Sequence, residues 1–179
     1  MNRSSLILAG LVLLLSACAP SEKPLTPSQL ALAKIDSLEA VLFSDSEKPA
    51  DPNSGMLLVR QYAQFYQSHP EDSLAVDMLF KAGEVSMGIG QGNLAVKYFR
   101  TVFEDHPSFV RAPEALFLCG FCEENVNADT AQARFFYQKF VDENPKHELA
   151  EDAKFSIQNL GMTDEDLIKM FEEKQALAK

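Results

Sequence analysis

The feature that most constrains the fold is a proline that returns at a nearly fixed interval. Pro70, Pro107 and Pro145 lie 37 and 38 residues apart, and they close the similar segments SHP, EDHP and ENP. Proline lacks a backbone N–H and disfavours helical geometry in the residue before it, so each of these prolines is expected to end a helix. A self-similar period of this length is typical of proteins built from stacked repeats.

The positions between these prolines keep the same interval. Each of the two middle units carries a glycine 13 residues after its first proline, then an alanine, and an aromatic residue four positions after that alanine. These residues are Gly83, Ala95 and Phe99 in the first unit and Gly120, Ala133 and Tyr137 in the second. One extra residue between the two helices of the second unit accounts for the change from 37 to 38. We expect the small residues to let helices approach closely and the aromatic rings to fill the space between them.

Helical periodicity also covers the rest of the chain beyond residue 26. After a cap signal at Thr26 and Ser28, apolar residues recur three and four positions apart, namely Leu32, Ile35, Leu38, Val41 and Leu42. The polar stretch SDSEKPADPNSG interrupts this pattern, and MLLVRQYAQFYQ resumes it, with Tyr62 and Phe65 matching the end of an earlier unit. Because no segment shows the sustained alternation of a strand, the sequence predicts an all-α domain over residues 27–179.

The combined pattern resembles the tetratricopeptide repeat, whose two-helix units carry glycine, alanine, an aromatic residue and a final proline in this order. The resemblance implies a tetratricopeptide-like solenoid of helical hairpins that binds other proteins. The last segment, TDEDLIKMFEEKQALAK, begins with Thr163 and Asp166 at capping-box spacing and carries Leu167, Ile168 and Phe171 on one side. We expect it to be a C-terminal capping helix, because the last repeat of a stack leaves one face uncovered.

The first 20 residues, MNRSSLILAGLVLLLSACAP, have the order of an export signal. Arg3 supplies a positive charge, an apolar run of ten residues follows, and Ser16 and Ala17 are small. The run is half of the about 20 residues that a transmembrane helix needs. The tetrapeptide LSAC in residues 15–18 resembles a bacterial lipobox, which implies cleavage before Cys18 and acylation of this cysteine. The alternative is an ordinary secretory signal with an incidental cysteine.

These features predict three segments: a lipoprotein signal peptide in residues 1–17, a lipidated N-terminus and tether in residues 18–26, and the helical domain in residues 27–179. The segment APSEKPLTPSQ contains three prolines, which favour an extended tether. At the position where the inner-membrane retention signal of enterobacterial lipoproteins has Asp, this chain has Ala19. We therefore expect a lipid-anchored protein of the cell envelope, at the outer membrane and facing the periplasm.

Acidic and aromatic residues recur at equivalent positions in the first helix of each unit. Asp77, Glu114 and Asp152 lie seven residues after the repeat prolines, and Phe80, Phe117 and Phe155 lie ten residues after them. The tetratricopeptide resemblance implies that these residues line a groove together with Glu84, Met87, Phe121 and Glu124. Such a groove suits a peptide or helix with basic and apolar side chains. The alternatives are that the phenylalanines are core residues and that the acids are part of a solvated surface.

Cys119 and Cys122 form a CxxC pair, which raises the possibility of redox chemistry. A redox pair usually lies at a helix N-terminus, where the helix dipole lowers the thiol pKa, whereas this pair falls in the middle of a predicted helix. We interpret both cysteines as packing residues and keep a thiol redox or sensor protein as the alternative. Zinc needs four ligands, and the histidines His69, His106 and His147 lie in different units, so neither a metal nor a cofactor is predicted.

Charge and the missing catalytic signatures narrow the function. Acidic residues outnumber basic ones 26 to 16 without any basic cluster, so nucleic acid is not an expected partner. No G-x-S-x-G, P-loop or H-E-x-x-H motif occurs in the sequence. The layout is similar to that of helical-repeat lipoproteins of outer-membrane protein assembly and of Tol-Pal repeat proteins. We therefore expect a non-enzymatic scaffold or adaptor for envelope proteins or peptides, with a passive spacer as a further alternative.

Overall fold

The structure, a computed structural model, describes residues 24–44 and 51–177. The predicted signal peptide in residues 1–17, the predicted lipidation site Cys18 and most of the tether lie outside the described residues. Within the two described ranges, no helix combines the length and the apolar character that a membrane span requires.

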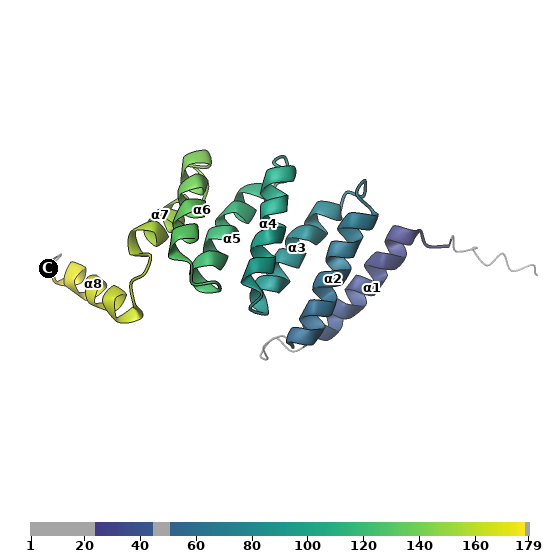
Figure 1. The fold of residues 1–179 in the computed structure, drawn as a ribbon, viewed down its shortest axis with the longest axis horizontal. Helices are drawn as coiled ribbons and strands as arrows, with labels where there is room; N and C mark the ends of the chain where they lie inside the picture. Colours follow the sequence, from purple (N-terminus) through teal and green to yellow (C-terminus); the bar gives the residue numbers. More distant parts are fainter. Residues whose placement is uncertain (1–23, 45–50, 178–179) are drawn as a thin grey trace, which may run out of the picture.

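Over the described ranges the chain forms eight helices and no strand (Figure 1). The helices are α1 (Pro27–Leu42), α2 (Pro52–Ser68), α3 (Ala75–Gly88), α4 (Gly92–Asp105), α5 (Ala112–Asn125), α6 (Thr130–Glu143), α7 (Ala150–Asn159) and α8 (Asp164–Leu177). From α1 to α7, each helix packs against the next one along the chain in a hairpin-like manner. The all-α prediction is therefore confirmed.

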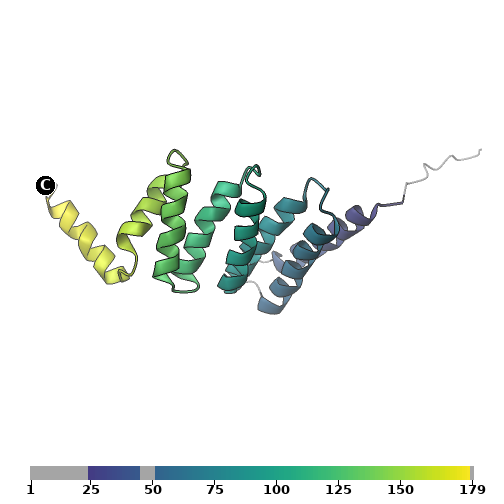
Figure 2. The ribbon, with the colours of Figure 1, turned by 45° about the horizontal axis from the view of Figure 1, so that its top comes forward.

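The helices from α1 to α7 alternate between two layers. Lys81 of α3 forms an ion pair with Glu39 of α1, so these two odd-numbered helices are neighbours. In the other layer, the guanidinium group of Arg100 on α4 lies over the ring of Phe136 on α6. In Figure 1 the even-numbered helices α2, α4 and α6 lie in front of the odd-numbered ones, and Figure 2 shows the same alternation from a second direction.

The offsets between helices reproduce the repeat interval. α3 and α5 begin 37 residues apart, α4 and α6 begin 38 residues apart, and all four helices have 14 residues. The difference arises in the loops, because residues 89–91 join α3 to α4 whereas residues 126–129 join α5 to α6. Each loop holds one residue with positive φ, Gly90 at 74° and Ala128 at 57°. The prediction of one extra residue in the second unit is confirmed.

The turns after α2, α4 and α6 share one pattern of backbone hydrogen bonds. After α2, the N–H of Asp72 donates to the carbonyl of His69 at 3.0 Å, and the N–H of Ala75 donates to the carbonyl of Asp72 at 2.9 Å. Equivalent bonds join Phe109 to His106, Ala112 to Phe109, His147 to Asn144 and Ala150 to His147. Each helix ends two residues before its repeat proline, as the restriction on the residue before proline predicts.

The predicted close approach of the helices at the glycines, with aromatic rings in the space between them, is confirmed in both middle units. A Cβ atom added at Gly83 would lie 2.6 Å from Cε1 of Phe99, and one added at Gly120 would lie 2.7 Å from Cδ1 of Tyr137. Both aromatic side chains are completely buried, as are the register alanines Ala95 and Ala133. The backbone of the first helix therefore touches the ring of the second helix directly, which a larger residue would prevent.

The C-terminal helix begins as predicted. The N–H of Asp166 donates to Oγ1 of Thr163 at 3.2 Å, and the N–H of Thr163 donates to Oδ2 of Asp166 at 3.1 Å. This reciprocal pair is a capping box in which Asp replaces the usual Glu or Gln.

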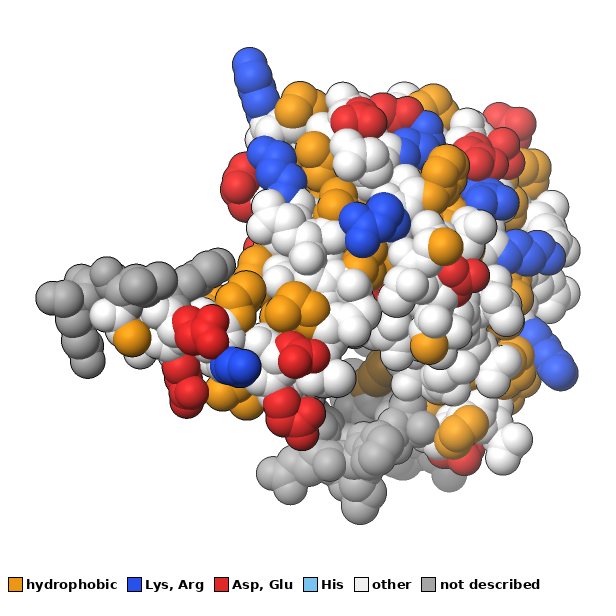
Figure 3. All heavy atoms as spheres, turned by 60° about the vertical axis from the view of Figure 1, so that its left-hand side comes forward, with side chains coloured by type: hydrophobic (Ala, Val, Ile, Leu, Met, Phe, Trp, Pro, Cys, Tyr) orange, Lys and Arg blue, Asp and Glu red, His pale blue; other side chains and the backbone are white. Residues whose placement is uncertain are grey.

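However, α8 does not pack along the stack. Its Phe171 stacks on Phe155 of α7 with 6.2 Å between ring centroids, and Ile168 and Phe171 remain 58% and 47% exposed. α7 ends after 10 residues, and Gly161 follows it with a φ of 85°, so the chain turns away from the last unit. Figure 3 shows hydrophobic side chains on the surface at this end of the molecule. α8 thus contacts the last unit through the Phe155–Phe171 pair, and the expectation that this segment caps the last repeat stays a prediction.

Candidate functional site

The ten side chains predicted to line a groove all lie on odd-numbered helices. They are Asp77, Phe80, Glu84 and Met87 on α3, Glu114, Phe117, Phe121 and Glu124 on α5, and Asp152 and Phe155 on α7. We call the surface formed by α1, α3, α5 and α7 the odd-helix face. Its charged residues discussed below are Glu39, Asp77, Lys81, Glu84, Arg111, Glu114, Glu124 and Asp152.

The three phenylalanines at equivalent register positions do not form an exposed ladder. Phe80 is completely buried and packs edge-to-face on Phe99, with 5.2 Å between ring centroids. Phe117 is half-buried and lies 5.4 Å from the ring of Tyr137. Phe155 is 42% exposed. The groove prediction for Phe80 is therefore corrected, because this residue belongs to the core.

The difference among these phenylalanines follows from what covers each one. Phe80 is covered by the next unit, whose Phe109 ring lies 6.3 Å away and whose Arg111 guanidinium lies 3.6 Å from the Phe80 ring centroid. Phe155 belongs to the last unit, and the ring that lies against it is that of Phe171 on α8, which is itself 47% exposed. Burial at one register position therefore depends on the unit that follows, which the register alone does not reveal.

Two further predicted groove residues also differ in exposure. Phe121 on α5 is 38% exposed, whereas Met87 on α3 is partly buried against the core. Phe121 is thus the predicted aromatic residue of α5 that is most open to a partner, since Phe117 packs between Tyr137 and Phe140.

The predicted acids occupy different environments. Asp152 is exposed and Asp77 is half-buried. Glu124 accepts a hydrogen bond from the hydroxyl of Tyr137 at 2.8 Å. Burial raises the pKa of Tyr137, and the hydrogen bond to Glu124 raises it further. Glu124 therefore helps to hold the packing tyrosine of its unit and remains partly open to solvent.

Glu84 and Glu114 are brought together by a residue that sequence reasoning missed. Arg111 Nε donates to Oε2 of Glu114 at 2.8 Å, and its Nη2 donates to Oε1 of Glu84 at 2.8 Å. These hydrogen bonds, first to Glu114 and then to Glu84, raise the pKa of Arg111. Because the guanidinium group also lies on Phe80, Arg111 joins α3 to α5.

A signal for Arg111 was present in the sequence. Its position is four residues after the repeat proline, where the neighbouring units have Leu74 and Leu149. A charged residue at a position that is apolar in both neighbours indicates a special contact, here with two carboxylates and an aromatic ring.

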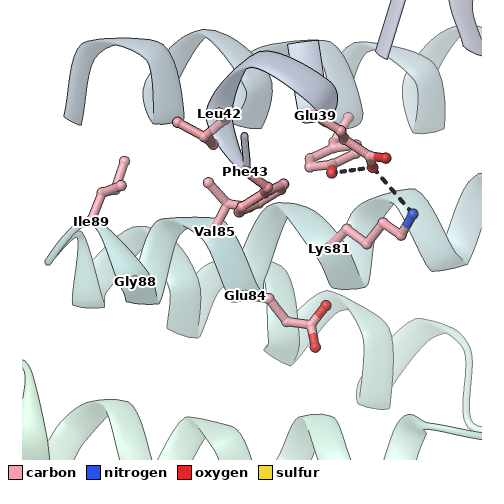
Figure 4. Close-up of a pocket in the computed structure, with 9 residues that line it drawn as sticks. Glu39, Leu42, Phe43, Lys81, Glu84, Val85, Gly88 and Ile89 are labelled. Atoms are coloured by element: carbon pink, nitrogen blue, oxygen red, sulfur yellow. Dashed lines mark hydrogen bonds and ion pairs between the residues drawn. The ribbon is translucent and has the colours of Figure 1, made fainter. Parts of the chain in front are cut away.

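A hollow of about 410 Å³ opens between α1, α2 and α3 (Figure 4). Its walls are Glu39, Leu42, Phe43, Tyr62, Lys81, Glu84, Val85, Gly88 and Ile89. Of these residues, only Glu84 belongs to the predicted groove. The others were missed because the first unit departs from the repeat register, with residues 43–51 between its two helices where the next unit has residues 89–91.

One end of the hollow is polar and internally paired. The hydroxyl of Tyr62 donates to Oε1 of Glu39 at 2.5 Å, and Lys81 Nζ donates to the same oxygen at 3.2 Å. Burial raises the pKa of Tyr62, and the hydrogen bond and charge of Glu39, followed by the charges of Glu84 and Asp77, raise it further. This end of the hollow therefore holds two carboxylates, those of Glu39 and Glu84, beside one ammonium group, that of Lys81.

Both cysteines of the CxxC pair are completely buried and form no disulfide. Cys119 lies with its sulfur 3.8 Å from the carbonyl oxygen of Val96. Burial raises the pKa of both thiols, that of Cys122 to about 12. A high pKa and a lack of access oppose thiolate chemistry, so the environment favours the packing interpretation.

The three histidines lie in separate turns. Nε2 of His106 is 2.8 Å from the hydroxyl of Tyr66, and Nδ1 of His147 accepts a hydrogen bond from the N–H of Leu149 at 3.2 Å. The ring of His69 stacks on Phe65. Among the residues that the structure describes, no group of three or more His, Cys, Asp or Glu side chains is placed to hold a metal ion.

We compared the sequence with protein-family models and with curated proteins. The sequence matches no protein-family model, and no curated protein matches it. The arrangement of charges and apolar walls on the odd-helix face therefore provides the basis for a functional proposal.

Proposed function

We propose that the protein is a lipid-anchored scaffold of the cell envelope, built from tetratricopeptide-like repeats, which binds a basic segment of another envelope protein on its odd-helix face. Three observations support the repeat assignment. They are the equal offsets of α3 to α6, the shared turns after α2, α4 and α6, and the packing of Gly83 and Gly120 on an aromatic ring of the next helix.

The charge balance of the odd-helix face carries the binding proposal. Glu39, Asp77, Glu84, Glu114 and Glu124 supply five carboxylates on α1, α3 and α5. The two basic groups described beside them, Lys81 and Arg111, are both engaged in ion pairs with members of this set. The face therefore keeps a surplus of negative charge, which favours a partner with Lys or Arg side chains.

Charge reversal tests this proposal. We expect Asp77→Lys to reduce the yield of cross-linked partner at least tenfold in intact envelopes, as measured by quantitative mass spectrometry. Asp142→Lys makes the same charge change on α6, in the other layer, and should leave the yield within twofold. Equal yields from both variants would contradict binding at the odd-helix face.

The anchoring proposal rests on the residues before α1. Acylation at Cys18 and cleavage before it would leave a tether of residues 18–26, so that the first helix begins close to the membrane surface. We expect labelling with radioactive palmitate to mark the wild-type chain and not Cys18→Ser. Cys119 and Cys122 are unchanged in this variant, so persistent label would place the lipid elsewhere.

A further inference from the structure

The hollow between α1, α2 and α3 has the size and the walls of a pocket for one bulky group. Its volume of about 410 Å³ lies at the small end of the range for ligand pockets, which is about 300–1,000 Å³. It opens to solvent on the odd-helix face, beside Glu84. A partner that lies along this face can therefore insert a side chain without any rearrangement of the helices.

The apolar end of the hollow is incompletely covered. Figure 4 shows Leu42 and Phe43 from the end of α1 facing Val85 and Ile89 from the end of α3. Phe43 is 57% exposed although it forms a wall of the hollow. Covering these side chains with a large apolar group removes apolar surface from water, which is the main source of affinity in such pockets.

The polar end selects the charge of the partner. The ammonium group of Lys81 is held by Glu39, so it is not free to attract an anion. Glu84 pairs with Arg111 through Oε1 and is partly exposed at the rim of the hollow. Glu39 and Glu84 supply two carboxylates to the wall of the hollow, and Lys81 supplies its one ammonium group. A cation is therefore favoured next to the inserted group, and an anion is disfavoured.

We propose that this hollow is the anchor pocket for a peptide segment in which one large aliphatic or aromatic side chain is flanked by Lys or Arg. The apolar side chain lies between Phe43, Val85 and Ile89, and the flanking basic group lies beside Glu84. This inference rests on the proposed function, because it names the part of the partner that the odd-helix face grips most tightly.

Gly88 provides a way to close the pocket without disturbing the core. It lines the hollow as the last residue of α3, and a Cβ atom added there meets nothing within 4 Å. Gly88→Phe adds a ring at the wall of the hollow, whereas Gly88→Ala adds a single methyl group there. The two variants therefore separate occupation of the pocket from loss of the glycine.

The test uses the full-length lipidated chain in phosphatidylcholine nanodiscs, with methyl-labelled isoleucine. The methyl resonance of Ile89 reports on the pocket, and that of Ile157 on α7 serves as the internal control. Three capped tetrapeptides are the probes: Lys-Leu-Phe-Lys, Lys-Ala-Ala-Lys and Glu-Leu-Phe-Glu. Empty nanodiscs measure how much of each peptide binds to lipid.

We expect Lys-Leu-Phe-Lys to shift Ile89 and not Ile157, with an affinity at least tenfold above that of either other peptide. Gly88→Phe should weaken this binding at least tenfold, and Gly88→Ala should change it less than twofold. Equal affinities for the three peptides, or unchanged binding to Gly88→Phe, would refute the anchor pocket.

Partner cross-linking in envelopes separates this proposal from the proposed function. Loss of the partner with Asp77→Lys but not with Gly88→Phe would overturn the anchor pocket and leave the odd-helix face as the binding surface. Retention of the partner by both variants would contradict the proposed function itself. Loss with both variants is the result that we expect.

Discussion

Two neighbouring junctions between odd-numbered helices are each bridged by one basic side chain, yet they are packed differently. Between α3 and α5, Arg111 pairs with Glu84 and Glu114 and lies 3.6 Å from the ring centroid of the buried Phe80. Between α1 and α3, Lys81 pairs with Glu39, and a hollow of about 410 Å³ remains beside this pair. The first junction is filled, and the second is open.

The difference follows from how closely each unit keeps the repeat register. In the filled junction, both units have 14-residue helices and a glycine that contacts an aromatic ring. In the first unit, α1 and α2 have 16 and 17 residues and a longer connection. The Arg111 guanidinium group lies 3.6 Å from the Phe80 ring centroid, whereas the Lys81 ammonium group lies 5.9 Å from the Tyr62 ring centroid, so the planar group packs more closely on its ring. Strict register thus produces core packing, and departure from it leaves room for a ligand.

The largest expected effect on stability comes from substituting one of two glycines of α3, one in the filled part of the stack and one beside the hollow. Gly83→Leu should lower the free energy of unfolding by about 3 kcal/mol or more, because even its Cβ atom would collide with the Phe99 ring. Gly88→Leu adds its side chain at the wall of the hollow, where an added Cβ atom meets no other atom, and we expect a change within about 0.5 kcal/mol. Urea unfolding followed by circular dichroism measures both values, and similar losses would show that the hollow is not open.

Alkaline pH should destabilise the filled part of the stack through its thiols. The pKa of Cys122 rises from 9.0 to about 12 on burial, and that of Cys119 rises as well. Above pH 9 the unfolded chain loses these protons while the folded chain keeps them. The contribution of the two thiols to the free energy of unfolding is therefore fully present below pH 9 and is lost as the pH rises above it. Linkage gives about 1.4 kcal/mol per pH unit for each thiol.

Thermal unfolding at pH 8 and pH 10 measures this loss. In the double variant Cys119→Ala, Cys122→Ala, we expect the loss of unfolding free energy between pH 8 and pH 10 to be smaller by about 2 to 3 kcal/mol, because two titrating thiols are removed. A thiol reagent should modify the native wild-type chain much more slowly than the unfolded chain. Rapid modification of the native protein would instead favour the thiol-based alternative function.

The repeat register predicted much of the fold because it is a local and repeated property. The prolines located the ends of α2, α4 and α6, and the fixed offsets of the glycines and aromatic residues indicated where the helices approach closely. The all-α class followed from periodicity in the same way. These features are determined within one unit, so a single sequence is sufficient to find them.

The candidate site was less accessible to prediction because it depends on contacts between units. Phe80 and Phe155 share a register position, but only Phe80 is covered by a following unit. The hollow arises in the unit with the weakest register, and Phe43 lies just beyond the end of α1. The exposed face of α8 depends on the turn at Gly161, whose positive φ directs the chain away from the stack.

Replacing either of the two bridging cations, Arg111 or Lys81, should have a smaller effect on the free energy of unfolding. Arg111→Leu should lower the free energy of unfolding by about 1 kcal/mol, because two charge-assisted hydrogen bonds and a ring contact are lost at a partly exposed site. Leucine fits there, since Leu74 and Leu149 occupy the equivalent positions. Lys81→Leu should cost about 0.5 kcal/mol or less. A double-mutant cycle with Glu114→Gln isolates the arginine pair, and a coupling energy near zero would contradict its bridging role.

Small effects are also expected in the loops that join the two helices of each middle unit. Gly90 and Ala128 both have positive φ, a region that costs a residue with a Cβ atom about 1 kcal/mol. Gly90→Ala should therefore lower the free energy of unfolding by about 1 kcal/mol, although no atom lies near its added Cβ. Ala128→Gly should raise it by up to about 0.5 kcal/mol, because relief of strain exceeds the added freedom of the unfolded chain.

Gly88→Ala is the matched control, since a Cβ atom added at Gly88 also meets no other atom and this residue does not have a positive φ. This variant should be neutral or stabilising. If Gly90→Ala and Gly88→Ala had effects of the same sign, the backbone conformation of the loop would not be the cause.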